Sequence, residues 1–170
     1  VLFRSSHSAL PALPLLASFA VLGVGCTVEA PACRVDPAHV DERRINSMCI
    51  VRSGSRVLAV VNRLSGKRDV PGGRREGDET GQCTAHRELW EETGIDATVG
   101  RLLIERNSTA WFECALPANV DATRDVAVPL WAHIEVADLE WVDASEQDPG
   151  DRRFPAGPGT LRSAPDRAHN

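Results

Sequence analysis

Length, composition and net charge already limit what this chain can be. Its 170 residues correspond to one domain with at most a short appendage. The 42% hydrophobic and 25% charged content predicts a folded body with a buried core. With 19 Lys and Arg against 24 Asp and Glu, the net charge is −5, which argues against binding to long nucleic-acid duplexes because such binders carry a basic surface.

The first 26 residues have the character of an export leader. Residues 1–5 (VLFRS) lack an initiator methionine and resemble a translated sequencing adapter, so they carry no structural weight. The uncharged run at residues 10–25 is shorter than the roughly 20 residues of a membrane helix and resembles the apolar part of a secretory signal. Small residues precede Cys26, so lipid attachment there is the one membrane contact we expect. The alternative is an out-of-gene translation that happens to be apolar.

Four further cysteines, Cys33, Cys49, Cys83 and Cys114, are candidates for disulfides. Export would place them in an oxidising compartment such as the periplasm, where disulfides persist. Four cysteines allow three pairings, and we expect Cys49 with Cys83 and Cys33 with Cys114. A cytoplasmic protein with buried free thiols is the alternative.

The rest of the chain divides into three parts. Residues 27–46 are polar, contain two prolines and predict a linker or loosely packed arm. Residues 47–154 form the expected folded domain. Residues 155–170 contain three prolines and no periodicity, which predicts a disordered tail.

Strand patterns surround one helical segment in the expected domain. Residues 48–52 and 56–63 are rich in β-formers and flank Ser53-Gly54-Ser55, which predicts a hairpin. A helix is expected between Thr80, a good N-cap, and Gly94, a good C-terminal cap. Four later strands are expected at residues 98–105, 108–116, 130–136 and 139–142, so the pattern indicates an α/β fold.

Three carboxylates share one face of the expected helix. Glu88, Glu91 and Glu92 stand at positions i, i+3 and i+4, where like charges repel. A hard divalent metal would compensate that repulsion and would also attract a phosphorylated small molecule. Arg87 is placed to reach Glu91 one turn on. If the three glutamates are considered without the residues around them, the alternative interpretation is a helix face that is simply exposed to solvent.

The segment from Gly73, GRREGDETGQCTAHRELWEETGI, resembles the Nudix box, G-x5-E-x7-R-E-U-x-E-E-x-G-U with U aliphatic, at every specified position. The matching residues are Gly73, Glu79, Arg87, Glu88, Leu89, Glu91, Glu92, Gly94 and Ile95. The chain is therefore similar to Nudix hydrolases, and in its leader and cysteines to exported, lipoprotein-type bacterial members.

The resemblance implies an α/β/α sandwich with a mixed β-sheet and a loop-helix-loop catalytic motif. It implies a metal-dependent hydrolase that cleaves a diphosphate bond in a nucleoside diphosphate linked to another moiety, with Mg²⁺ or Mn²⁺. A non-catalytic sensor with the same fold is the alternative, although the intact acidic positions favour hydrolysis.

Individual roles follow by position from the same resemblance. Glu91 and Glu92 would be principal metal ligands, Glu88 a ligand or general base, and Gly72 a backbone carbonyl ligand. Arg87 would orient the glutamates, and Glu79 would support them, while Leu89, Gly94 and Ile95 are structural. The resemblance also implies an acidic ligand from a later segment, for which Glu135 is our choice over Glu113 and Glu140.

Substrate contacts are expected around the glycine turn. Gly73 allows close approach of a phosphate, and Arg63 and Arg74 are candidates to contact substrate oxygens. The alternative is that these basic side chains are only exposed to solvent and make no substrate contact. Trp111 and Phe112 alternate across a strand, so at most one of them would stack on a base, and core packing is expected for both.

Overall fold

A computed structural model describes residues 30–143 of the chain. The expected leader with Cys26 and the expected tail lie outside the described residues. The described part contains, in chain order, η1 (Pro37–His39), β1 (Asn46–Ser53), β2 (Arg56–Asn62), β3 (Arg68–Asp69), β4 (Gly72–Gly73), α1 (Gly81–Thr93), β5 (Thr98–Arg106), β6 (Thr109–Ala115), η2 (Leu130–Ile134) and β7 (Val136–Asp143). No helix within residues 30–143 is both long and apolar enough to cross a membrane.

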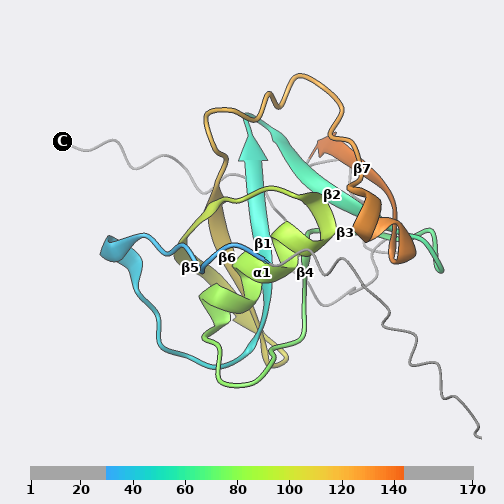
Figure 1. The fold of residues 1–170 in the computed structure, drawn as a ribbon. Coiled ribbons are helices and arrows are strands. Elements are labelled where there is room, and N and C mark those ends of the chain that lie inside the picture. Colours follow the sequence, from blue (N-terminus) through green and yellow to red (C-terminus); the bar gives the residue numbers. More distant parts are fainter. Residues whose placement is uncertain (1–29, 144–170) are drawn as a thin grey trace, which may run out of the picture.

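The strands form one mixed sheet with α1 across one face (Figure 1). The central order is β3-β2-β1-β6-β5, in which β1 and β6 run parallel and the other neighbours run antiparallel. The chain therefore has the α/β fold with a mixed sheet that the sequence predicts.

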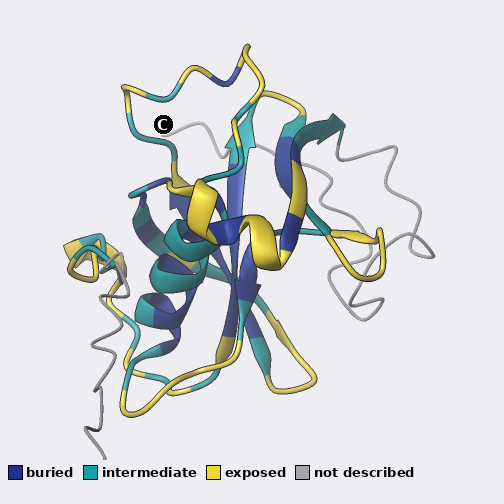
Figure 2. Cartoon of the chain, turned by 45° about the vertical axis from the view of Figure 1, so that its right-hand side comes forward, coloured by how far each residue is buried: buried dark blue, intermediate teal, exposed yellow. Residues whose placement is uncertain are grey.

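Alternation along β1 divides the core between the two faces of the sheet. Cys49 and Val51 face α1 and pack with Leu89, whereas Met48 and Ile50 pack on the opposite face. Successive side chains of a strand point to opposite faces, so a continuous apolar run is buried on both sides. Figure 2 shows the buried residues concentrated in the sheet and on the inward side of the helix.

The sheet opens where β1 and β2 separate, and the glycine turn fills the gap. β1 pairs with β2 only at Arg52 and Ser53, while β7 pairs along the whole of β2. The segment that follows β2 contains β3 and β4. β3 pairs with β2, and β4 pairs with β1, where Ser47 lies opposite Gly73. This wedge brings the two glycines of β4 under the helix.

Local sequence accounts for the limits of α1. The Thr80 hydroxyl accepts a hydrogen bond from the Cys83 N–H at the N-terminus, which satisfies one of the free amides of the first turn. Gly94 ends the helix with φ of +71°, and its N–H donates to the Trp90 carbonyl. Left-handed backbone is natural for glycine, so the predicted helix and both of its caps are confirmed.

The strand predicted at residues 130–136 is wrong. Residues Leu130–Ile134 form the 3-10 helix η2, and β7 begins only at Val136. Pro129 precedes η2, and the Ala132 N–H donates to the Pro129 carbonyl, so a turn replaces extended backbone. The β-forming side chains of this stretch do not decide its conformation, because β-propensity depends strongly on the surrounding sheet.

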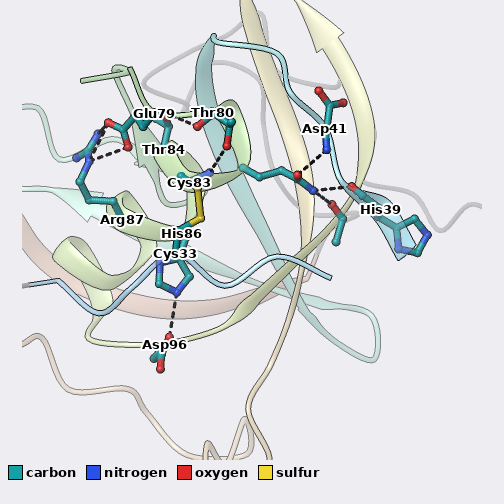
Figure 3. The surroundings of a disulfide bond; sticks show 12 residues. Cys33, His39, Asp41, Glu79, Thr80, Cys83, Thr84, His86, Arg87 and Asp96 are labelled. Carbon is teal, nitrogen blue, oxygen red and sulfur yellow. Dashed lines mark hydrogen bonds and ion pairs between the residues drawn. A yellow bond between two sulfur atoms is a disulfide. The ribbon is translucent and has the colours of Figure 1, made fainter. Parts of the chain in front are cut away.

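The described part of the expected linker arm lies against α1 and β5. Val35 forms a bridge with Val99, and the Gly81 N–H donates to the Arg43 carbonyl. The Gln82 side chain joins three segments, because its amide donates to the carbonyls of His39 and Gly100 and its oxygen accepts from the Asp41 N–H. Figure 3 shows the Cys33–Cys83 disulfide beside these contacts.

Both disulfides are present, but the predicted pairing is wrong. Cys33 is joined to Cys83 with a Cα–Cα distance of 5.2 Å, and Cys49 is joined to Cys114 at 5.8 Å. Cys49 and Cys114 lie on the neighbouring parallel strands β1 and β6 and face the same side. Cys83 lies in the first turns of α1, on the side that meets the arm. Strand adjacency, which the sequence does not show, decides the pairing.

The two disulfides differ in accessibility, which predicts an order of reduction. Cys33 is exposed, whereas Cys49 and Cys114 are buried. Increasing dithiothreitol, followed by alkylation and mass mapping, is expected to label Cys33 and Cys83 first, because thiol exchange needs access to a sulfur. Labelling of Cys49 first would contradict this order.

Removal of the Cys33–Cys83 disulfide is expected to lower the stability of the fold. The free energy of unfolding of the Cys33→Ser/Cys83→Ser variant, measured in urea, is expected to be about 2–4 kcal/mol lower than that of the wild type, since a cross-link restricts the unfolded chain.

Candidate active site

Glutamates from two separate parts of the chain line one hollow of about 210 Å³. Three of them, Glu88, Glu91 and Glu92, lie in α1, and the fourth, Glu135, directly follows η2. The lining is completed by Trp131, Ala132, Ile134 and Val136. The hollow thus has an acidic side from the helix and an apolar side from η2 and the start of β7.

Arg87 holds the carboxylates of the box together. Its guanidinium lies 3.0 Å from a Glu88 oxygen and 2.8 Å from a Glu91 oxygen, and it donates to Glu79 at 3.0 Å. Burial acts to lower the pKa of Arg87, but the hydrogen bonds and charges of these three glutamates hold that pKa above its ordinary value. One cation therefore neutralises part of the repulsion along the helix face.

Glu88 has a strongly raised pKa in its place beside the hollow. Burial raises its pKa from the ordinary 4.5 to about 7, the charge and hydrogen bond of Arg87 act to lower it, and the charges of Glu91 and Glu135 raise it further. Its side chain is only 16% exposed. A carboxyl whose pKa lies near neutrality can exchange a proton at physiological pH.

The two glycines of β4 lie against the glutamates. The Gly72 N–H donates to a Glu92 carboxylate oxygen at 3.0 Å. A Cβ on Gly73 would lie 2.5 Å from a Glu88 oxygen, so any larger residue would displace that carboxylate. A Cβ on Gly72 would meet the backbone of Ser47 at 2.5 Å. Glycine at both positions thus permits the close packing of turn, strand and helix.

The oxygen atoms around the hollow are of the kind that a hard divalent cation prefers as ligands. Four carboxylates around one hollow supply only oxygen ligands, which Mg²⁺ and Mn²⁺ prefer. Within residues 30–143, no group of three or more His, Cys, Asp and Glu side chains is arranged to hold a metal ion. Glu88 and Glu91 instead contact Arg87, and Glu92 accepts from Gly72. A cation would therefore compete with these partners for the carboxylates.

The other expected site residues lie in different places. Glu113 pairs with Arg101 at 2.7 Å and Glu140 with Arg68 at 2.6 Å, so neither lines the hollow and Glu135 does. Trp111 and Phe112 are buried on opposite faces of the sheet, in agreement with expected core packing.

Basic side chains expected at the substrate do not line the hollow. Arg63 is exposed and donates to the carbonyl of Val136, a residue that lines the hollow. Arg74 is exposed as well, and its carbonyl accepts from Arg87. Lys67 lines a separate, smaller hollow of about 10 Å³ together with Gly72 and Glu92.

The sequence interpretation missed the aromatic part of the site. Trp131 belongs to the segment that the sequence predicts as a strand, but it lies in η2, lines the hollow and stacks on Trp90 with ring centroids 5.0 Å apart. Its indole N–H donates to the Glu91 carbonyl at 3.1 Å. Pro129 just before this stretch was the one signal for a turn.

The described residues thus combine a mixed sheet, a capped helix and an acidic hollow between that helix and the η2 region. A family model, the NUDIX domain, matches residues 42–158. The chain belongs to this family.

Relatives of known name share part of the chain. A MutT-like protein of Streptomyces ambofaciens is 36% identical over 80 residues, which is 44% of this chain and 52% of that protein. Phosphatase NudJ of Escherichia coli K12 is 45% identical over 51 residues, 29% of this chain and 33% of its own length. The chain thus spans about half or less of these relatives.

Solved structures of low identity share the fold. A UDP-X diphosphatase gives a TM-score of 0.52 at 18% identity, with 72% of this chain and 61% of that chain covered. An ADP-ribose pyrophosphatase from Streptococcus suis gives 0.52 at 13% identity, with coverage of 66% and 81%. These likenesses support the α/β architecture of the chain.

The raised pKa of Glu88 predicts a stability that falls as pH rises. The folded chain binds this proton up to about pH 7 and the unfolded chain only to about 4.5, so stability decreases between these values. In EDTA, the wild type is expected to lose on the order of 2–3 kcal/mol more than Glu88→Gln from pH 4.5 to 8. Urea unfolding at both pH values measures the difference. Glu42→Gln, at an exposed position, is the matched control, and equal pH dependence in wild type and Glu88→Gln would contradict the assignment.

Proposed function

We propose that this protein hydrolyses a diphosphate bond in a small molecule in which a nucleoside diphosphate is linked to another moiety. The observation that carries the proposal is the convergence of four glutamates from two remote segments on one hollow. Membership of the NUDIX family and the complete box support it. We also propose that the reaction depends on Mg²⁺ or Mn²⁺.

The binding of the cation is assigned to the acidic side of the hollow. Glu91 and Glu92 are the principal ligands in this proposal, with Glu88, Glu135 and the carbonyl of Gly72 as the further oxygens. When bound, a divalent cation neutralises diphosphate oxygens and makes a water more acidic. The three helix glutamates present their oxygens to one side of the hollow, and the Glu88 side chain among them is only 16% exposed.

Proton transfer is assigned to Glu88. Its side chain lines the hollow and is only 16% exposed, and a carboxylate within hydrogen-bond reach of an attacking water can accept its proton. Arg87 positions this carboxylate through the 3.0 Å contact, and Glu79 holds Arg87 in turn. Gly73 leaves the space that Glu88 occupies.

The proposed reaction is an in-line displacement at one phosphorus. The oxygen of water forms a bond to phosphorus while the bridging oxygen leaves with the bond electrons. The water proton passes to the Glu88 carboxylate, and the products are two phosphorylated molecules, or phosphate and a monophosphate.

A substrate panel with three variants tests the proposal. The panel contains nucleoside triphosphates, nucleotide sugars, ADP-ribose, dinucleoside polyphosphates and isoprenoid diphosphates, assayed with Mg²⁺, with Mn²⁺ and with EDTA. Glu88→Gln is expected to lower kcat about 10²- to 10⁴-fold, the usual contribution of a general base. Glu91→Gln is expected to abolish turnover, and EDTA to abolish it in the wild type.

Glu42→Gln is the matched control, because Glu42 is exposed and does not line the hollow. It is expected to retain the parental rate. Parental turnover in Glu91→Gln would overturn the ligand assignment. Tight binding of a panel member without any turnover would favour the non-catalytic sensor.

We further propose that the protein is exported and works in an oxidising compartment, with lipid attachment at Cys26 as the membrane contact. The two disulfides support this location, because such bonds persist mainly outside the reducing cytoplasm. Fractionation of the source cells and mass analysis of the purified protein test it. Free thiols at all four cysteines in the native protein would contradict export.

A further inference from the structure

Arg63 contacts the junction at which η2 passes into β7. It directly follows β2, and its backbone N–H donates to the Glu135 carbonyl at 2.8 Å. Its guanidinium donates to the next carbonyl, that of Val136, at 2.9 Å, and the same nitrogen lies 3.4 Å from the His133 Nδ1 atom. One residue thus contacts both ends of the stretch from His133 to Val136, where η2 and β7 lie beside the end of β2 (Figure 1).

Strand pairing alone does not fix this junction. β2 and β7 pair in regular register from Arg56 to Val61, but the register shifts at the next position, where Asn62 lies opposite Val136. Such a bulge disrupts the ladder of hydrogen bonds and bends the strand. Val136 is only 1% exposed, and a buried carbonyl needs a donor. The Arg63 guanidinium supplies one, so it stabilises the irregular entry into β7.

Glu135 depends on this junction more than the other acids of the hollow do. Each of the three helix glutamates has a donor that holds its carboxylate, either Arg87 or the N–H of Gly72. Within residues 30–143, the Glu135 carboxylate makes no hydrogen bond or ion pair. Its place in the hollow therefore follows from the position of its backbone, which Arg63 secures at two successive carbonyls.

We propose that Arg63 is a positioning residue for Glu135, because it fixes the start of β7 and thereby keeps the Glu135 carboxylate beside the glutamates of α1. The inference rests on the proposed function, in which Glu135 is a ligand of the cation. It gives Arg63 a role other than the substrate contact that the sequence predicts. Partners that orient a metal ligand contribute to metal affinity without touching the metal themselves.

The sign of the effect distinguishes positioning from two other roles of an arginine at this place. Arg63 carries a positive charge, so its removal would strengthen cation binding if it acted through its charge alone. A residue that only contacts substrate would leave the affinity for the cation unchanged when no substrate is present. Of the three roles, only positioning predicts weaker cation binding after the positive charge is removed.

Titration of the full chain with Mn²⁺ alone measures this affinity, through the electron paramagnetic resonance signal of free Mn²⁺. Arg63→Gln is expected to bind Mn²⁺ about 10- to 100-fold more weakly than the wild type, as is Glu135→Gln. The double variant Arg63→Gln/Glu135→Gln is expected to bind no more weakly than Glu135→Gln, because both changes act on the same ligand and their effects do not add.

Arg68→Gln is the matched control. Arg68 lies in β3, and its guanidinium also reaches β7, where it pairs with Glu140 at 2.6 Å. Glu140 does not line the hollow, so Arg68→Gln is expected to keep the wild-type affinity for Mn²⁺.

Arg63→Lys separates charge from geometry. It keeps the positive charge but replaces the planar guanidinium with a single ammonium group, so its affinity for Mn²⁺ is expected to lie between those of the wild type and Arg63→Gln. If Arg63→Gln does not fold by circular dichroism, Arg63→Lys decides the question. Wild-type affinity in Arg63→Lys would then contradict the inference.

Equal or tighter Mn²⁺ binding in folded Arg63→Gln would overturn the inference, as would a loss of the same size in the Glu135→Gln background. Both outcomes leave the proposed function intact when Glu135→Gln itself binds Mn²⁺ weakly. Wild-type affinity in Glu135→Gln would instead contradict the assignment of Glu135 as a ligand, and with it the role of Arg63. A wild type that hydrolyses nothing but shows the expected Mn²⁺ affinities contradicts only catalysis.

Discussion

The ion pairs of Arg87 are the interaction on which the site depends. Three glutamates along one helix face repel one another, and a fourth from another segment adds to the negative potential. Arg87 contacts Glu88 and Glu91 of its own helix and Glu79 of the preceding loop. These ion pairs reduce the repulsion between the carboxylates and also orient them. Burial raises the pKa of Glu88 to about 7, and the charges of Glu91 and Glu135 add to that rise. The fold thus keeps in place a charge arrangement that a bound cation would complete.

The surrounding structure serves to hold this helix in register. Ala85 and Leu89 pack the inner face of the helix onto the sheet. Gly73 of β4 lies directly against the Glu88 side chain of the same helix. At the N-terminal end, the arm is attached by the Cys33–Cys83 disulfide and by Gln82. At the other end, Trp131 bonds to the backbone of Glu91. A rigid helix matters because catalytic groups lose effectiveness when they shift by small distances.

Errors in the sequence interpretation have a common physical origin. The stretch at residues 130–136 carries β-forming side chains, but Pro129 and contacts to the helix turn its first part into η2. The predicted cysteine pairing is wrong because the Cys49–Cys114 bond follows from β1 and β6 being parallel neighbours in the sheet. Conformations and pairings of this kind depend on which elements meet, and one sequence without its fold does not reveal that.

The local features, in contrast, are determined by the sequence itself. The hairpin, the helix between Thr80 and Gly94 and the stripe of glutamates follow from turn residues, caps and periodicity, which act between residues a few positions apart. Tertiary structure alone decided that Cys33 meets Cys83 and that Trp131 lies beside the acids, and it is the sheet and η2 that bring Glu135, the acid expected from the resemblance, to the glutamates of α1. Those arrangements join segments up to 50 residues apart. Their geometry comes from the packing of the whole sheet and helix, because no local preference specifies which distant segments become neighbours.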